Sequence, residues 1–236
     1  MQQILSKMRK AIEEYNMIDD GDKIAVCVSG GKDSITMLNG LKALQRFYPK
    51  HFDLVAISVN PGFDFFDTHF LKELCKNIDV DYIEAKSDIK EIVFDIRKEK
   101  NPCSLCANLR RGILNSTAIQ NGCNKLALGH NEDDVLETFL LNFLYAGNLS
   151  TFSPISYMDR SQITLIRPLI YAPEREIRKF IKRNEICVMD KTCPMDGVSK
   201  REYMKELLYK FVIDIPNVRA NMIGAIKRAK INGWKE

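Results

Sequence analysis

The stretch Lys23-Ile24-Ala25-Val26-Cys27-Val28-Ser29-Gly30-Gly31-Lys32-Asp33-Ser34 decides how the rest of this chain is interpreted. Its apolar first half predicts a buried strand over residues 23–28, and residues 33–47 have the pattern of a helix. Two glycines between a strand and a helix let the backbone turn sharply and bring bare N–H groups to a phosphate. The N-terminus of the following helix adds positive charge at the same place. The stretch therefore predicts a phosphate-binding loop over residues 29–34.

The polar side chains of this loop suit a nucleotide. Ser29 and Ser34 offer hydroxyl donors, and Lys32 can neutralise phosphate charge. Asp33 can hold a magnesium ion that bridges the phosphates. The spacing is neither that of a Walker A loop nor that of a Gly-x-Gly-x-x-Gly dinucleotide fingerprint. A Gly-Gly turn without a ligand is the plainer alternative, and the complete Ser-Gly-Gly-Lys-Asp-Ser string disfavours it.

Outside the loop, short apolar runs alternate with helical patterns. Further strands are predicted at 54–59, 82–84, 125–128 and 163–166, and helices at 4–17, 66–77, 132–145, 173–183, 199–211 and 216–230. This alternation predicts an α/β fold with a doubly wound, mainly parallel, five-stranded sheet and a helical C-terminal appendage. The predicted units are an N-terminal helix over 1–20, a nucleotide-binding domain over 21–172 that includes the Cys-x-x-Cys segment, and a helical region over 173–236.

A second motif, Leu128-Gly129-His130-Asn131-Glu132-Asp133-Asp134, follows the fourth predicted strand. Gly129 permits close backbone approach, and Asn131 is a candidate N-cap for the next helix. The carboxylates of Asp133 and Asp134 would be stabilised at a helix N-terminus. Because ligands of doubly wound sheets bind at the carboxyl ends of strands, we expect this motif beside the loop over 29–34. A helix cap next to a surface histidine is the simpler alternative.

Composition limits the functional classes. The chain has 236 residues, of which 45% are hydrophobic and 28% charged, as in soluble globular proteins, and its formal net charge is +4. Basic residues gather at Arg110-Arg111, over 175–183 and after Lys227, where they suit RNA phosphates or form solvated helix faces. Because the sequence has neither a membrane-spanning run nor a signal-peptide pattern, we expect a cytoplasmic location and no membrane partner.

The chain has seven cysteines, and an odd number without a signal-peptide pattern argues against a disulfide framework. Cys103 and Cys106 form a Cys-x-x-Cys, a spacing that lets two thiolates converge on one metal or cluster; a redox dithiol is the alternative. Cys193, just before a predicted helix, is a third candidate ligand, and Cys187 would be a fourth for a structural zinc. Three ligands suit a [4Fe–4S] cluster with one open iron, where sulfide can bind.

Together these motifs resemble a known family. The loop over 29–34 matches the PP-loop of the N-type ATP pyrophosphatases. The segment Cys103-Ser104-Leu105-Cys106-Ala107-Asn108-Leu109-Arg110-Arg111-Gly112-Ile113-Leu114 resembles the TtcA family, the tRNA 2-thiocytidine synthetases. The resemblance covers about residues 20–212. In longer family members a further cysteine often follows the third one, and here the matching position is Asp196. Some uridine thiolases carry Lys where Arg110 stands, and Arg110 fits the cytidine branch.

The resemblance implies an ATP-dependent tRNA thiolase. Such an enzyme adenylates a tRNA pyrimidine, here expected to be cytidine, at its C2 oxygen, releases pyrophosphate and replaces that oxygen with sulfur. The implied cofactors are ATP, Mg²⁺ and a [4Fe–4S] cluster. The implied partners are tRNA and a sulfur donor, either sulfide or a cysteine desulfurase. A homodimer is compatible with this interpretation.

The site residues implied by the resemblance fall into three sets. The ATP-binding set is Ser29, Gly30, Gly31, Lys32, Asp33, Ser34, Ser58, Val59, Gly129, His130 and Arg167, with Asn60 adjoining. The catalytic set is Lys32, Asp33, Arg110 and Asp133, and the metal ligands are Cys103, Cys106 and Cys193. Two alternatives stay open: another PP-loop ligase, amidating or lysidine-type, with a structural zinc, and a non-catalytic nucleotide- and cluster-binding partner in sulfur transfer.

Overall fold

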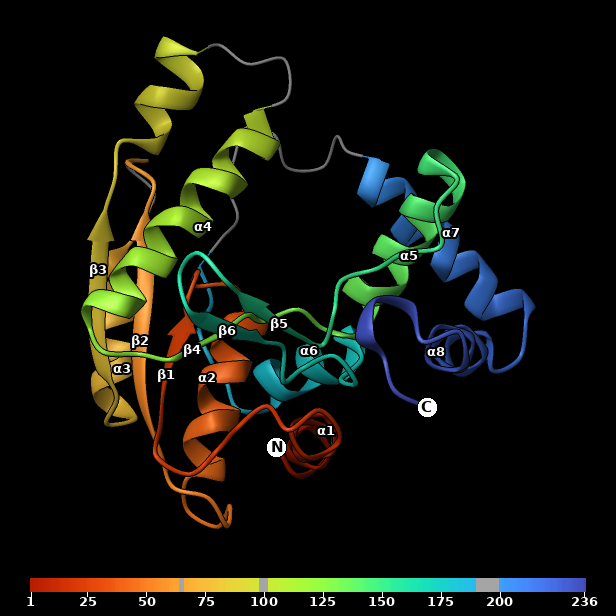
Figure 1. The fold of residues 1–236 in the computed structure, drawn as a ribbon, viewed down its shortest axis with the longest axis horizontal. Coiled ribbons are helices and arrows are strands. Elements are labelled where there is room, and N and C mark those ends of the chain that lie inside the picture. The colour runs from red at the N-terminus through yellow and green to blue at the C-terminus, as the bar shows by residue number, and fades with distance from the viewer. Residues whose placement is uncertain (64–65, 98–101, 190–199) are drawn as a thin grey trace.

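The structure, a computed structural model, describes residues 1–63, 66–97, 102–189 and 200–236. Its strands are β1 (Asp22–Cys27), β2 (Phe52–Asn60), β3 (Asp81–Lys86), β4 (Lys125–Ala127), β5 (Ile155–Met158) and β6 (Ile163–Ile166). They form one sheet in the order β3-β2-β1-β4-β6-β5. All neighbouring strands are parallel except β5, which runs antiparallel to β6. The expected α/β class and doubly wound, mainly parallel sheet are confirmed (Figure 1).

The predicted number of strands was one too low. The five expected strands are present, and the described residues contain a sixth, β5, at the edge of the sheet. Its sequence is short, its burial is only partial, and Tyr157 in its middle is exposed. An edge strand of this kind lacks the continuous apolar run that marked the buried parallel strands.

Helices cover both faces of the sheet (Figure 1). They are α1 (Gln2–Glu14), α2 (Lys32–Leu44), α3 (Thr68–Asn77), the π-helix η1 (Glu91–Ile96), α4 (Pro102–Gln120), α5 (Glu132–Ala146), α6 (Glu174–Arg183), α7 (Lys200–Asp214), α8 (Val218–Arg228) and the 3₁₀ turn η2 (Ile231–Gly233). On one face, Val55 and Ile57 pack with Val93 of η1 and Leu114 of α4. On the other face, the remaining α-helices contribute to a larger apolar core. The alternation of side chains along each strand thus produces two cores.

The C-terminal helices share the larger core. Met204 of α7 and Ile226 of α8 are fully buried in the same cluster as Ile4 of α1 and Val26 of β1. The proposed boundaries after residues 20 and 172 therefore separate segments whose side chains pack together, and they stay a prediction. Among the described helices, none combines the length and the apolar character that a membrane crossing requires.

The strand order creates a switch point between β1 and β4. From β1 the sheet grows through β2 to β3 on one side and through β4 to β6 and β5 on the other. The connections leaving β1 and β4 therefore diverge at their carboxyl ends, where doubly wound sheets bind their ligands. Residues 29–34 and 129–134 follow these two strand ends directly.

Candidate active site

The phosphate loop between β1 and α2 is closed by its own serines. Ser34 is buried, its Oγ accepts the N–H of Ser29 at 3.2 Å, and it donates to the carbonyl of Gly31 at 2.9 Å. Gly30 has φ +79°, in the left-handed region that only glycine enters readily. Met189, the last described residue before the gap at 190–199, donates its N–H to the carbonyl of Gly30 at 2.9 Å. The loop conformation therefore depends on glycine at position 30 and on the hydrogen bonds of Ser34.

Lys32 lies between two carboxylates. Its Nζ is 2.8 Å from Asp33 Oδ2 and 2.9 Å from Glu174 Oε1 at the start of α6. Burial would lower the pKa of Lys32, but these two carboxylates outweigh it and hold the pKa above its ordinary value. Burial would likewise raise the pKa of Glu174, yet Lys32, Lys205 and Arg178 together outweigh that effect and lower the pKa to about 2. Both groups are therefore charged at neutral pH.

The second motif lies directly against the first. A Cβ atom at Gly129 would be 3.2 Å from the backbone N of Ser34 and 3.3 Å from the carbonyl carbon of Asp33. Asn131 donates its side-chain N–H to Asp33 Oδ1 at 3.0 Å. The expected proximity of the two motifs is confirmed, and it depends on the missing side chain at position 129.

The first turn of α5 carries acids that are engaged by helices far along the chain. Asn131 and Asp134 form a reciprocal capping box. The backbone N of Asn131 is 2.9 Å from Asp134 Oδ2, and the backbone N of Asp134 is 3.1 Å from Asn131 Oδ1. Arg219 of α8 binds both carboxylate oxygens of Asp133, at 2.8 and 2.7 Å. Arg201 of α7 donates to Asp134 at 2.7 Å. The predicted catalytic residue Asp133 therefore lies at the site edge with an arginine partner.

His130 and Arg167 meet at the carboxyl ends of the neighbouring strands β4 and β6. Arg167 Nε donates to His130 Nδ1 at 3.2 Å, and Arg167 Nη1 donates to the carbonyl of Ser153 at 2.6 Å. Burial, together with the charge of Arg167, lowers the pKa of His130 to about 3. Burial and the charge of Arg111 lower the pKa of Arg167 to about 10. Within the described part of the chain, Arg167 forms no ion pair with a carboxylate.

The remaining predicted nucleotide residues are the last three residues of β2. Ser58 is fully buried and its hydroxyl pairs with that of Tyr82. Val59 is also buried, and the side chain of Asn60 donates to Glu84 at 2.9 Å. The side chains of these three residues thus pack within the protein beside the β1 end.

The Cys-x-x-Cys opens α4. Proline at its first position, Pro102, favours helix initiation, and Cys103 and Cys106 are three residues apart on the same face. Cys103 is exposed and Cys106 half-buried. Cys193 lies outside the described residues, and the described residues alone contain no group of three or more His, Cys, Asp or Glu side chains that could hold a metal ion.

Arg110 lies one helical turn after Cys106 on α4. Its Nη2 is 3.7 Å from Cys106 Sγ, and its Nε is buried without a hydrogen-bond partner in the described part of the chain. Burial raises the pKa of the Cys27 thiol to about 11, and the positive charge of Arg110 works against that rise. The guanidinium thus lies on the cysteine helix itself, and its charge acts on the thiol of Cys27, the last residue of β1.

Comparisons with known proteins agree with this geometry. Residues 1–210 match the family described as PP-loop domain. The tRNA-cytidine(32) 2-sulfurtransferase of Citrifermentans bemidjiense is 40% identical over 226 residues, covering 94% of this chain and 89% of the relative. The enzyme of the same name from Histophilus somni is 40% identical over 223 residues, covering 92% and 70%.

The chain belongs to the tRNA-cytidine 2-sulfurtransferase family.

Two solved structures have a similar fold. The U34-tRNA thiolase NcsA from Methanococcus maripaludis, which was solved with its [4Fe-4S] cluster, has a TM-score of 0.79 and 25% identity, covering 95% of this chain and 77% of that one. The NH3-dependent NAD synthetase from Campylobacter jejuni, with a TM-score of 0.51 and 16% identity over 96% of this chain and 91% of its own, shares the fold. The resemblance to the tRNA 2-thiocytidine synthetases is confirmed, and with it the expected enzyme class, a tRNA sulfurtransferase.

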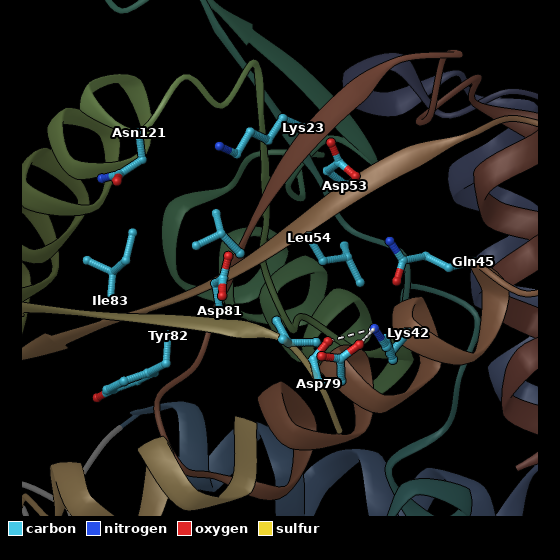
Figure 2. A pocket seen from close by; sticks show the side chains of 12 residues that line it. Lys23, Lys42, Gln45, Asp53, Leu54, Asp79, Asp81, Tyr82, Ile83 and Asn121 are labelled. Carbon is cyan, nitrogen blue, oxygen red and sulfur yellow. Dashed lines mark hydrogen bonds and ion pairs between the residues drawn. The ribbon is translucent and has the colours of Figure 1, made fainter. Parts of the chain in front are cut away.

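A hollow of about 690 Å³ lies on the opposite edge of this sulfurtransferase-family chain (Figure 2). It is lined at the amino ends of β1, β2 and β3, where Lys23, Asp53 and Asp81 face it, and Lys42 pairs with Asp79 at its rim. None of the predicted site residues lines this hollow. The candidate site is therefore the carboxyl edge at the β1–β4 switch point.

Two residues that hold this site together were not expected from the sequence: Glu174 of α6 and Arg219 of α8 reach the two nucleotide motifs. Arg201 of α7, a basic residue that would suit an RNA phosphate, pairs with Asp134 of the second motif. No local pattern marks these contacts, because acidic and basic residues are common on helix surfaces. The residue types at these positions do not indicate which distant side chains they bind.

Proposed function

We propose that this protein is an ATP-dependent tRNA thiolase that activates the C2 oxygen of a cytidine and replaces it with sulfur. The observation that carries the proposal is the direct contact between the phosphate loop and the second motif, and the Cys-x-x-Cys helix, in which Arg110 bonds to Cys106, adds to it. The name of the relatives that are 40% identical supports cytidine as the base. Neither a PP-loop ligase with a structural zinc nor a non-catalytic sulfur-transfer partner is favoured by these relatives.

In the proposed reaction the C2 oxygen attacks the α-phosphorus of ATP, and the bond from that phosphorus to the bridging oxygen breaks. Pyrophosphate leaves with the electron pair of that bond. The loop residues Ser29 to Ser34 and the N-terminus of α2 would hold the leaving group, and Lys32 would neutralise its charge. Asp33, oriented by Asn131, is the proposed ligand for Mg²⁺.

Arg167 is proposed to bind the phosphate that becomes AMP. A buried guanidinium is costly unless an anion compensates its charge, and among the described residues no carboxylate does so. Its donor bond to His130 keeps that imidazole neutral, with Nδ1 as the acceptor. This arrangement leaves positive charge facing a position next to the phosphate loop, which favours a bound anion.

Cys103, Cys106 and Cys193 are proposed to hold the [4Fe–4S] cluster. Two of these thiols lie at the N-terminus of α4, whose positive end favours thiolates, so the described part of the donor set fits. When bound, a cluster with one open iron would supply a binding place for the sulfur atom. Arg110 would stabilise negative charge between the cysteines and the nucleotide.

Several partners belong to the same proposal. tRNA would contact exposed cations near the site, of which Arg111 and Lys200 are examples, whereas Lys227 is paired with Glu14 at 2.7 Å. The sulfur donor is either sulfide or a cysteine desulfurase, and a homodimer and a cytoplasmic location remain expectations.

The test is ATP-dependent thiolation of bulk tRNA by protein purified without oxygen and reconstituted with iron and sulfide, read by nucleoside mass spectrometry. We expect 2-thiocytidine in the wild type and at least a hundredfold loss, about 2.7 kcal/mol or more of barrier, in Cys103→Ser. Cys187→Ser, at an exposed thiol outside the pair, is the matched control. A 2-thiouridine product would move the target base. No thionucleoside despite pyrophosphate release would contradict the thiolase.

A further inference from the structure

A chain of charged contacts runs from α8 to the phosphate loop, and it begins at Arg219. The guanidinium binds Asp133 with two parallel bonds, at 2.8 and 2.7 Å, and donates its Nε to Glu132 at 2.9 Å. The three side chains are only 22%, 17% and 16% exposed. Bidentate arginine–carboxylate pairs of this kind fix orientation as well as contributing energy.

The second link joins α5 to α6. Asp133 Oδ2, besides binding Arg219, accepts the backbone N–H of Glu174 at 2.6 Å. Residue Pro173 precedes α6 at the N-cap position, and a proline side chain has no acceptor for the first N–H groups of a helix. Asp133 therefore caps α6 from another helix and fixes where its first residue lies.

The third link ends on the loop. The carboxylate of Glu174 receives Lys32 Nζ at 2.9 Å and is flanked by Arg178 at 2.8 Å and Lys205 at 3.5 Å. These cations hold Glu174 in one place, so that it aligns the Lys32 side chain along the loop. Arg219 itself lies beyond residues 1–210, the part of the chain that matches the PP-loop domain.

We infer that Arg219, Asp133 and Glu174 form a positioning relay that directs Lys32 toward the phosphates of ATP. The inference rests on the proposed function, since it takes the loop over 29–34 as the ATP site. Loss of Arg219 leaves the Asp133 carboxylate without its cation, loosens the cap of α6 and lets Glu174 and Lys32 turn away from the loop. The last described α-helix is thereby a functional part of the nucleotide site.

The experiment compares Arg219→Gln, Arg219→Lys and the control Arg228→Gln, an exposed arginine on the same helix. ATP binding is measured by titration calorimetry with Mg-ATP, and thiolation gives KM for ATP and kcat separately. We expect Arg219→Gln to weaken ATP binding and raise KM about tenfold, the effect of one charge-assisted contact, with kcat within about twofold. Arg219→Lys, which keeps the charge without the fork, should lie between.

Three outcomes have distinct meanings. Equal ATP affinity in Arg219→Gln and Arg228→Gln, with only the melting temperature of the former reduced, would overturn the relay and leave a structural ion pair. A wild type that binds ATP but does not thiolate tRNA would contradict the proposed function. The relay would then be tested by the ATP affinity of Arg219→Gln compared with that of Arg228→Gln. If Arg219→Gln does not fold, Asp133→Asn, which keeps the shape of the capping side chain, must show the same rise in KM or the relay fails.

Discussion

His130 is a half-buried imidazole whose proton state is set by desolvation and by a neighbouring arginine. Its Nδ1 accepts from Arg167 Nε, so the neutral form is the one that the site requires. Burial and the charge of Arg167 lower its pKa from 6.5 to about 3. Below pH 6.5 the unfolded chain therefore binds a proton that the folded chain does not bind, and stability falls as the pH drops from there toward 3.

We predict that His130→Gln removes this part of the pH dependence. From about pH 7 to about pH 5 the melting temperature of the wild type should fall more steeply than that of the variant, because Gln does not titrate. His69→Gln, at an exposed histidine, is the control and should follow the wild type. Parallel melting profiles of wild type and His130→Gln would mean that the imidazole binds its proton equally well in the folded and the unfolded protein.

Residue types were visible in the sequence only where the chemistry is local. The spacing of Ser29 to Ser34 and of Gly129 to Asp134 marks both motifs, because neighbouring residues in the chain make each of them. The bond from Arg219 to Asp133 joins helices that are far apart in sequence, and charge patterns on a helix do not name their partner. The depth of Arg167 in the protein was equally invisible, since arginine is ordinarily exposed.

At the scale of elements, the start of α5 connects helix stability to the nucleotide site. The side chain of Asn131 caps the helix by accepting the N–H of Asp134 at 3.1 Å, and its amide nitrogen also donates to Asp33 at 3.0 Å. One side chain thus performs two functions, and substitutions can separate them.

We predict that Asn131→Ala lowers the free energy of unfolding by about 1 kcal/mol through loss of the cap, and that Asn131→Ser largely retains it. Both variants lose the contact with Asp33 and should bind Mg-ATP several-fold more weakly, because Asp33 is no longer oriented. Chemical denaturation and calorimetry measure the two effects. If Asn131→Ser binds Mg-ATP as the wild type does, Asp33 needs no help from α5.

Elements differed in how well their sequences revealed them. Strands β1 and β2 were predictable because burial on both faces leaves continuous apolar runs. The edge strand β5 has no such run, and α4 was not predicted as a helix although Pro102 at its first position is a start signal. Both elements are only partly buried, and which of their residues are covered depends on the elements that pack against them in the folded protein.

At the scale of the whole molecule, the two ends of the described chain are joined by an aromatic cluster. Trp234 is 1% exposed, and its ring centroid lies 6.1 Å from that of Tyr15 and 6.0 Å from that of Tyr171. Its indole N–H donates to the carbonyl of Phe152 at 3.1 Å. The cluster therefore ties the segment after α8 to α1 and to the segment before α6.

We predict that Trp234→Ala lowers the free energy of unfolding by about 3–5 kcal/mol, the range for loss of a buried large aromatic side chain. Tyr209→Ala, at a tyrosine 67% exposed on α7, is the control and should change stability by about 0.5 kcal/mol or less. Urea titrations followed by circular dichroism give both values. A loss under about 1 kcal/mol in Trp234→Ala would show that the cluster lies outside the cooperative core.

The pairing of β1 with β4 also affects the order of events during folding. These strands are hydrogen-bonded neighbours, although β2, β3 and α4 lie between them along the chain. Their pairing must close a long loop, which is entropically costly and slow compared with the formation of local contacts. The two halves of the nucleotide site therefore come together late during folding. A bound nucleotide would recognise only the finished protein, and it would prolong the life of the native state without hastening its formation.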